Sequence, residues 1–202
     1  MSSSPSKCLV LATANRHKVE ELRAILAPLG ALELRSLLDY PGFPTVAETE
    51  ETFEGNARLK ALACARHTGL LALADDSGIV VDALGGRPGV LSARYAPSGE
   101  KANRRLLSEM RDVPDGRRQA RYVAAMALAW PDGRCVVRTG TCEGEIARAP
   151  RGRGGFGYDP IFWLPDRGRM MAELAPEEKN AISHRRRALE AILPILKEAW
   201  GA

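Results

Sequence analysis

Residues 70–81 read LLALADDSGIVV, and this stretch decides the fold. The run at residues 70–74 is apolar and has the length of a buried strand, and residues 79–81 resume the apolar pattern. Two adjacent acids, Asp75 and Asp76, interrupt it. The pattern predicts a buried strand with both carboxylates at its tip, followed by a short second strand.

Adjacent carboxylates beyond a buried strand are stable when they hold a cation or accept hydrogen bonds. Hard oxygen ligands suit Mg²⁺, which commonly binds one or two carboxylates together with substrate phosphates. The alternative is an ordinary Asp-Ser-Gly turn between two strands. Acids near the start of the preceding helix can supply another ligand, although acids are expected there anyway: Glu48, Glu50, Glu51 and Glu54.

Apolar spacing, glycines and prolines predict the elements on either side of this stretch. Before it we expect a strand at 8–12 (CLVLA), a helix at 17–29, a strand at 32–36, a loop at 40–47 and a helix from the Thr52 cap to about His67. After it we expect a turn at 85–89, a helix at 100–110, a hairpin of strands at 119–130 and 134–143, a strand at 161–164 and a helix at 184–199 that Pro194 kinks or splits.

The bulk composition fits one globular domain over residues 1–202, or two lobes that share a sheet, after a short flexible N-terminus at residues 1–6. No apolar run approaches the roughly 18 residues that cross a bilayer, so we expect a cytoplasmic protein with no membrane partner. The four cysteines lack paired spacing and are predicted to be reduced and mostly buried. A net charge of +4 favours an anionic ligand but is small for a DNA-binding protein.

Two segments are candidates for binding phosphate. Residues 13–18 (TANRHK) join a strand to a helix, where free backbone N–H groups and the helix dipole attract an anion. Lys18 can add a charge there, or it is a solvated lysine after an ordinary cap. Asn56 and Lys60 share one face of the next helix, so Lys60 points inward to phosphate or outward to solvent.

Two later segments are candidates for binding a base. Residues 152–160 (GRGGFGYDP) form a glycine-rich loop in which Phe156 or Tyr158 can stack on a base, or can dock on the core of a surface loop. Residues 179–187 (KNAISHRRR) concentrate donors around the start of the last helix, with Ser183 as its expected cap. These donors can form hydrogen bonds with a carbonyl oxygen or a phosphate, form a solvated basic face, or contact nucleic acid.

Five motifs together resemble the Ham1-like, or RdgB-type, family of inosine/xanthosine triphosphate pyrophosphatases: TANRHK, ETFEGNARLKA, ADDSGIVVDALGGRPGVLSARYA, GGFGYDPIF and KNAISHR. The resemblance implies a mixed α/β fold related to Maf, with an elongated central sheet flanked by helices and two lobes around an active-site cleft. It also implies a homodimer that hydrolyses ITP, dITP, XTP and dXTP to the monophosphate and pyrophosphate. Such an enzyme removes deaminated purine nucleotides before they enter DNA or RNA.

The resemblance also implies roles for individual residues. Asp76 would bind Mg²⁺, of which the subunit holds one or more, and accept a proton, with Glu48 as a second metal ligand. Asp75 would assist Asp76, and two lysines, Lys18 and the phosphate-binding Lys60, would complete the catalytic set. Triphosphate would be bound by the first motif, Thr13, Ala14, Asn15, Arg16, His17 and Lys18. Substrate would be contacted by Ser77, and the base pocket lined by Phe156, Gly157, Tyr158, Asp159, Lys179, His184 and Arg185.

The chain departs from the family pattern at Ala14, which replaces a glycine, at Gly55, which replaces a glutamate, and at Asn180, where serine is common. Gly55 leaves open whether Glu48 or Glu54 completes the metal site. Two other functions are compatible with the sequence. One is a Maf-like pyrophosphatase for modified pyrimidine nucleotides, and the other is a basic nucleic-acid-binding module that uses residues 185–187.

Overall fold

The computed structural model describes residues 7–201, so the predicted flexible N-terminus lies outside the described residues. Its seven-stranded sheet has the order β2-β1-β3-β4-β5-β6-β7. β1 is parallel to β2 and β3, whereas β6 is antiparallel to β5 and β7, so the predicted mixed α/β sheet is confirmed.

The strands are β1 Cys8–Leu11, β2 Glu33–Ser36, β3 Ala72–Val81, β4 Gln119–Ala129, β5 Cys135–Ile146, β6 Phe162–Leu164 and β7 Arg169–Met170. The helices are α1 Arg16–Leu26, α2 Phe53–Thr68, α3 Gly99–Glu109, α4 Pro176–Ile182 and α5 His184–Ala199. Short 3₁₀ segments are η1 Ala27–Leu29, η2 Leu37–Asp39, η3 Asp82–Leu84, η4 Gly89–Arg94, η5 Asp159–Ile161, η6 Pro165–Arg167 and η7 Met171–Glu173.

The described residues form two compact units. The first contains residues 7–76, 124–140 and 185–201, and the second contains residues 77–123 and 141–184. β3, β4 and β5 pass through both units, so neither unit is a continuous segment of the chain. No helix among residues 7–201 is both long and apolar enough to cross a membrane.

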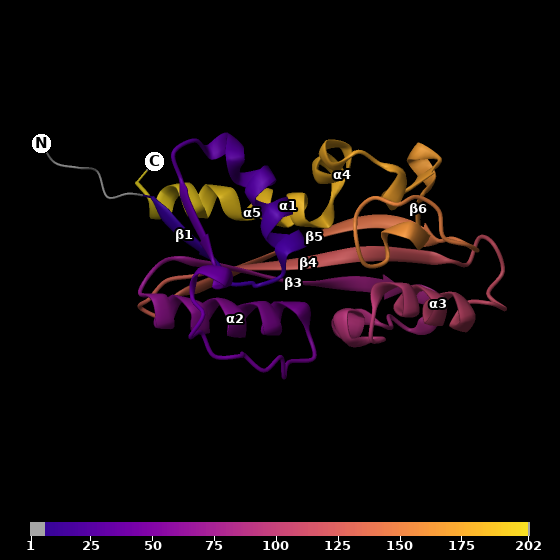
Figure 1. Ribbon diagram of the computed structural model, residues 1–202, viewed down its shortest axis with the longest axis horizontal. Helices are drawn as coiled ribbons and strands as arrows, with labels where there is room; N and C mark the ends of the chain where they lie inside the picture. The colour runs from indigo at the N-terminus through magenta and orange to yellow at the C-terminus, as the bar shows by residue number, and fades with distance from the viewer. Residues whose placement is uncertain (1–6, 202) are drawn as a thin grey trace, which may run out of the picture. The chain divides into compact units, whose positions relative to one another are not determined.

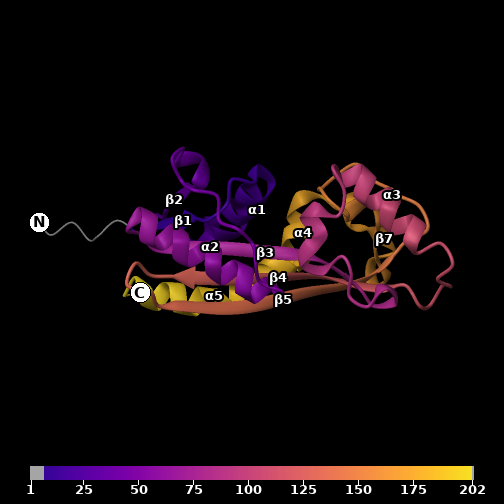
Figure 2. The same ribbon diagram turned by 90° about the horizontal axis from the view of Figure 1, so that it is seen from below.

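In the first unit, α2 covers one face of the strands, and α1 and α5 cover the other (Figure 1). α1 buries Val19, Leu22, Ile25 and Leu26, which recur on one side of a helix. α2 begins at the predicted Thr52 cap, whose side chain accepts a hydrogen bond from Gly55 N, and ends at Gly69, whose φ is 67°. Small buried residues line α2, so its backbone lies close to β3 (Figure 2).

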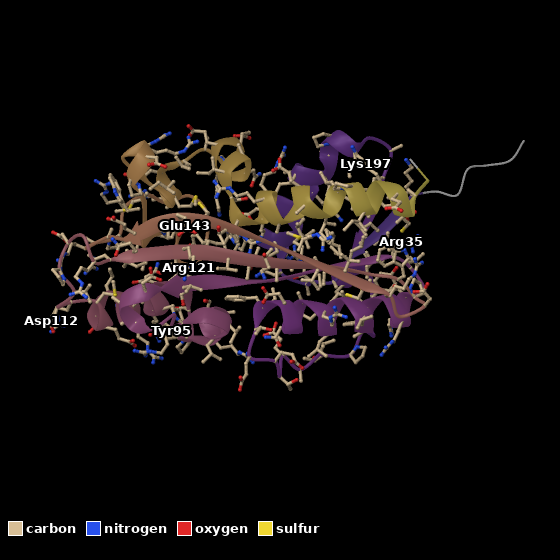
Figure 3. The ribbon with its side chains drawn as sticks, turned by 180° about the vertical axis from the view of Figure 1, so that it is seen from behind. Arg35, Tyr95, Asp112, Arg121, Glu143 and Lys197 are labelled. Carbon is tan, nitrogen blue, oxygen red and sulfur yellow. The ribbon has the colours of Figure 1, made fainter. Side chains whose placement is uncertain are left out.

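In the second unit, α3 packs through Ala102 and Leu106 into a core that includes Ile79 and Phe162. Tyr95 lies on the α3 side of the strands (Figure 3). Its hydroxyl donates to Glu109 Oε2 at 2.6 Å, and Arg105 Nε donates to Glu109 Oε1 at 2.9 Å. The Tyr95 hydrogen bond ties the end of α3 to the segment that follows β3, and the Arg105 bond lies within α3.

The structure corrects the prediction that a strand ends at the acid pair. β3 runs without a break from Ala72 to Val81, and both Asp75 and Asp76 lie inside it. The sequence suggested a break because carboxylates are costly in a buried strand. Cations from neighbouring helices neutralise them, and such long-range partners are invisible in the local pattern.

Two further differences concern helices. α4 was not predicted, and α5 continues past Pro194, which excludes a split, one of the two predicted effects of this proline. Apolar side chains of α5 pack into the core on both sides of the proline, including Ile192 and Leu196, and this packing holds the helix together. The predicted hairpin is confirmed, since Trp130 N donates to Arg134 O at 3.0 Å across its turn. All four thiols are free, but only Cys64 and Cys142 are buried.

Glu109 makes the stability of this protein depend on pH. The hydrogen bond from Tyr95 and the nearby arginines lower the pKa of Glu109 below its ordinary value of 4.5. A lowered pKa in the folded state gives stability that is present above the ordinary value and is lost as the pH falls through the lowered one. We therefore expect Glu109→Gln to lower the free energy of unfolding by about 1 kcal/mol at neutral pH.

Urea unfolding at neutral and acidic pH measures this effect. The difference between Glu109→Gln and the unmodified protein should shrink as the pH falls below the ordinary carboxyl pKa. Glu100→Gln on the same helix is the matched control, because the Glu100 side chain is 81% exposed. An equal loss at both pH values would contradict the assignment.

Candidate active site

The segment before α1 supplies the N-cap of that helix, and Lys18 in the first turn of the helix points away from solvent. Thr13 Oγ1 accepts a hydrogen bond from Asn15 N at 3.1 Å, and Asn15 Oδ1 accepts one from Lys18 N at 3.3 Å. Ala14, Arg16 and His17 are exposed beside them. The Lys18 side chain is only 17% exposed and reaches β3. The start of α1 and a partly buried ammonium therefore lie together, and both attract an anion.

Asp75 and Asp76 lie inside β3, where successive side chains point to opposite faces of the sheet. Asp75 Oδ2 lies 3.0 Å from Lys18 Nζ and accepts a hydrogen bond from Arg185 Nε at 2.9 Å. Asp76 Oδ1 lies 2.6 Å from Lys60 Nζ. Lys18 and Arg185 come from α1 and α5 on one face of β3, whereas Lys60 comes from α2 on the other (Figure 1). Each buried carboxylate therefore has cations on its own face.

Three oxygen atoms from three residues converge on the ammonium of Lys60. They are Asp76 Oδ1 at 2.6 Å, Glu48 Oε1 at 2.9 Å and the backbone oxygen of Asp75 at 3.1 Å. The Lys60 side chain is 15% exposed, so the solvated alternative does not hold. Two carboxylates and a carbonyl that converge on one cation form a set of hard oxygen donors.

Asn56 holds the loop that carries Glu48. Its buried amide accepts a hydrogen bond from Glu50 N at 3.0 Å and donates one to Glu50 O at 3.1 Å. A Cβ on Gly55 would lie 2.6 Å from Glu50 Cβ, so this path of the loop requires glycine at 55. The departure from the family pattern therefore has a steric reason. It is Glu48, not the exposed Glu54, that contacts Lys60.

Burial and the neighbouring charges shift the pKa values of this cluster. Burial raises the pKa of Asp76 above 3.8, and Glu48 adds to the rise, while Lys60 and Lys18 oppose it. Burial lowers the pKa of Lys18 below 10.5 despite the carboxylate of Asp75. Burial also disfavours the charged form of Lys60, but Asp76 and Glu48 outweigh this effect and raise its pKa. A cation bound at Asp76 would relieve the cost of burying that carboxylate.

Arg185 is buried between two carboxylates of the first unit. Besides Asp75, it contacts Glu21 of α1, whose Oε2 lies 2.9 Å from Arg185 Nη1. Together, Asp75 and Glu21 raise the pKa of Arg185 more than burial lowers it. The structure thus brings Arg185 to the acid pair. Sequence reasoning missed Glu21, because nothing local distinguishes it from its exposed neighbour Glu20.

In the second unit, Asp159 organises the glycine-rich loop. Its Oδ1 accepts a hydrogen bond from the Tyr122 hydroxyl at 2.9 Å. Its Oδ2 accepts from Phe156 N at 2.8 Å and lies 2.6 Å from Lys179 Nζ. A Cβ on Gly155, whose φ is +68°, would overlap Asp159 Oδ2, so this position also requires glycine. The carboxylate gathers the loop and a buried ammonium into one cluster.

The two aromatic residues of this loop have different surroundings. Tyr158 is buried, and its hydroxyl donates to Ser92 O at 2.9 Å, so it docks on the core. Phe156 is half-buried, with Lys179 Nζ 4.6 Å from its ring centroid. Of the two rings, Phe156 is therefore the one placed to stack on a ligand. Gly157 is exposed, and its carbonyl accepts a hydrogen bond from Asn103 of α3.

The remaining predicted residues have the following positions. Ser77 is half-buried in β3 directly after Asp76. His184 is buried, and its ring stacks on Tyr122 with centroids 4.8 Å apart. Ser183 lies between α4 and α5. Neither Tyr122 nor Asn103 was singled out in the sequence, since each lies far along the chain from the residues it contacts.

The carboxylate and carbonyl oxygens of the acid cluster are the kind of ligand atom that Mg²⁺ binds. Among residues 7–201, no three side chains of the His, Cys, Asp and Glu types gather as a metal site by themselves. Asp76 and Glu48, however, both direct an oxygen at one cation. Mg²⁺ typically binds one or two carboxylates and takes its other ligands from water and substrate phosphates. Asp76 and Glu48 provide the two carboxylates of this coordination pattern.

Comparison with known proteins places the chain in a family. A sequence model of the Ham1 family matches residues 9–195. A dITP/XTP pyrophosphatase of Geobacillus kaustophilus is 54% identical over 197 residues, which cover 96% of this chain and 94% of that protein. One from Symbiobacterium thermophilum is 56% identical over 188 residues, 93% of each. The solved structure of a HAM1 protein from Coxiella burnetii matches with a TM-score of 0.85 at 41% identity, and the match covers 95% of this chain and 99% of that one. The chain belongs to the Ham1 family.

Proposed function

We propose that this protein hydrolyses deaminated purine nucleoside triphosphates, ITP, dITP, XTP and dXTP, to the monophosphate and pyrophosphate. The observation that carries the proposal is the convergence of Asp76, Glu48 and the backbone of Asp75 on the Lys60 ammonium. The name dITP/XTP pyrophosphatase, shared by relatives that are 54% and 56% identical, supports the choice of substrate. Such an activity removes these nucleotides from the precursor pool.

In this proposal Asp76 and Glu48 would hold Mg²⁺, and the bound ion would supply charge neutralisation at phosphate oxygens and activation of a water. Lys18 and the start of α1 bind the triphosphate, and Lys60 stabilises the charge that develops on the leaving pyrophosphate. Asp76 accepts the proton of the attacking water. Asp75, already neutralised by Lys18 and Arg185, holds those cations in place.

Base selection follows from hydrogen-bond matching. Hypoxanthine and xanthine carry a 6-oxo acceptor where adenine carries an amino donor, so a buried donor in the site would face an unpaired clash with ATP. Lys179, His184 and Arg185 are the donors assigned to the base by family resemblance. Phe156 provides the half-buried ring for stacking. Magnesium dependence, a cytoplasmic location and a homodimer belong to the same proposal.

The nucleic-acid alternative gains no support from the basic run at residues 185–187. Arg185 is buried against Asp75 and Glu21, and Arg186 Nε donates to Glu190 at 2.6 Å. A nucleic-acid contact uses exposed, unneutralised basic side chains. Arg185 therefore faces the interior and Arg186 pairs on its own helix, which leaves Arg187 as the exposed member of the run.

Measuring pyrophosphate release over a nucleotide panel tests the function. We expect ITP, dITP and XTP to react at least about 100-fold more efficiently than ATP, because the 6-amino group of adenine mismatches donors that fit a 6-oxo group. GTP shares the 6-oxo group, so its exclusion must involve the 2-amino position. Chelation of Mg²⁺ should abolish the reaction, and added Mg²⁺ should restore it. A preference for methylated UTP or CTP would instead identify a Maf-like enzyme, and equal release from ATP would contradict the proposed specificity.

Asp76→Asn should reduce kcat by about 10²- to 10⁴-fold, because the variant loses both a proton acceptor and an anionic metal ligand. Steady-state kinetics with ITP at saturating Mg²⁺ measure the loss. Asp82→Asn is the matched control, since Asp82 lies just past the end of β3 and is half exposed. Full activity in Asp76→Asn would overturn the assignment.

Asp75→Asn should differ from Asp76→Asn in stability. Removing the Asp75 charge leaves Lys18 without its carboxylate partner and Arg185 with Glu21 alone, and the uncompensated charge of Lys18 costs about 3 kcal/mol. Asp76→Asn should cost less, because Lys60 keeps Glu48 as its partner. Urea unfolding of the two variants makes the comparison, and the reverse order would show that the acids do not divide these roles.

A further inference from the structure

Tyr122 connects two parts of the cluster that the family resemblance assigns to the base. It lies on β4 and is 7% exposed. Its ring stacks on His184 with an interplanar angle of 13° and packs against Phe162 with centroids 4.5 Å apart. Its hydroxyl donates to Asp159 Oδ1 at 2.9 Å. One side chain thus touches both His184, which begins α5, and Asp159, which organises the glycine-rich loop.

The stacking determines the plane of the His184 imidazole. Two nearly parallel rings with centroids 4.8 Å apart attract each other in an offset-stacked arrangement. Because the N–H groups of an imidazole lie in the plane of its ring, fixing that plane also fixes the directions in which His184 donates hydrogen bonds. A buried aliphatic side chain at 122 would fill the space without imposing a plane.

The hydroxyl of Tyr122 affects the loop in a second way. Asp159 Oδ1 accepts from Tyr122, while Oδ2 accepts from Phe156 N and pairs with Lys179. The tyrosine thus orients the carboxylate so that its other oxygen faces the ammonium and the loop amide. The position of Lys179 over the Phe156 ring depends on this orientation.

We propose that Tyr122 is a positioning residue for base recognition, which acts through His184 and Asp159 without contacting the nucleotide. The proposal rests on the proposed function, because it concerns how that function selects its base. It extends the set of specificity-determining residues to β4, a strand that carries none of the five motifs. The ring orients His184, and the hydroxyl orients Asp159.

Two substitutions separate the ring from the hydroxyl. Tyr122→Phe keeps the ring and loses the bond to Asp159, whereas Tyr122→Leu loses both. We expect the ratio of kcat/KM for ITP to that for ATP to fall about threefold in the phenylalanine variant and at least about tenfold in the leucine variant, since a misplaced group costs up to 10²-fold. Tyr122→Met is a second ringless variant if the leucine protein does not fold.

Tyr95→Leu is the matched control. Tyr95 is a tyrosine of the same unit, also 7% exposed, whose hydroxyl contacts Glu109 instead of the base cluster. A general loss of packing would lower activity in both leucine variants alike, with the ITP to ATP ratio unchanged. A positioning role lowers the ratio only in the Tyr122 variants.

Proton NMR of the imidazole rings supplies a readout that does not depend on activity. The chain has three histidines, so the His184 signals can be assigned by their loss in His184→Gln. The Tyr122 ring current should shift them upfield in the unmodified protein and in Tyr122→Phe, and the shift should disappear in Tyr122→Leu. Unchanged His184 signals in Tyr122→Leu, or an unchanged nucleotide ratio, would overturn the inference.

The unmodified protein distinguishes this failure from failure of the proposed function. If it releases pyrophosphate from ITP and ATP equally, the proposed function itself is wrong, whatever the variants do. If it prefers ITP and the folded Tyr122→Leu or Tyr122→Met protein keeps that preference, the proposed function stands and the role of Tyr122 is wrong.

Discussion

The structure depends on how β3 buries two adjacent carboxylates. Strand alternation sends Asp75 and Asp76 to opposite faces of the sheet, and each face has a helix that brings a lysine. A buried charge without a partner costs several kcal/mol, so neither acid is tolerable alone. Because Asp75 is neutralised by Lys18 and Arg185, Asp76 is the acid that shares its cation with Glu48. This asymmetry separates a structural carboxylate from a candidate catalytic one.

Ordinary packing positions the cations of this cluster. The apolar stripe of α1 lies on the core, which directs Lys18 toward β3 one turn after the cap. Small side chains along α2 let that helix approach the strands closely, so Lys60 reaches the acids with little exposure. The loop bearing Glu48 is held by a buried amide, Asn56, and by the missing side chain at Gly55. The positions of Lys18, Lys60 and Glu48 therefore follow from the amphipathicity of α1, the close packing of α2 and the steric fit of the loop.

The second unit uses a carboxylate differently. Asp159 accepts a hydrogen bond from the Tyr122 hydroxyl through Oδ1, and it accepts from a loop amide and from Lys179 through Oδ2. Both oxygens of this carboxylate are occupied, and a buried hydrogen-bonded network restricts the movement of its members. A fixed set of donors is what the proposed discrimination between a 6-oxo group and an amino group requires. The two aromatic residues of the loop also differ in role: Tyr158 anchors the loop on the core, and Phe156 stays accessible.

The sequence by itself determined the mixed α/β class, most elements and the cap of α2, because these follow from local periodicity and from residues with strong capping preferences. It also carried the family resemblance that the comparisons bear out. It did not determine that β3 continues through Asp75 and Asp76, that Arg185 pairs with Asp75 and Glu21, or that Tyr122 stacks on His184. Those outcomes were decided by contacts between residues as much as 164 positions apart, and the charges and rings that stabilise them meet only when the chain is folded.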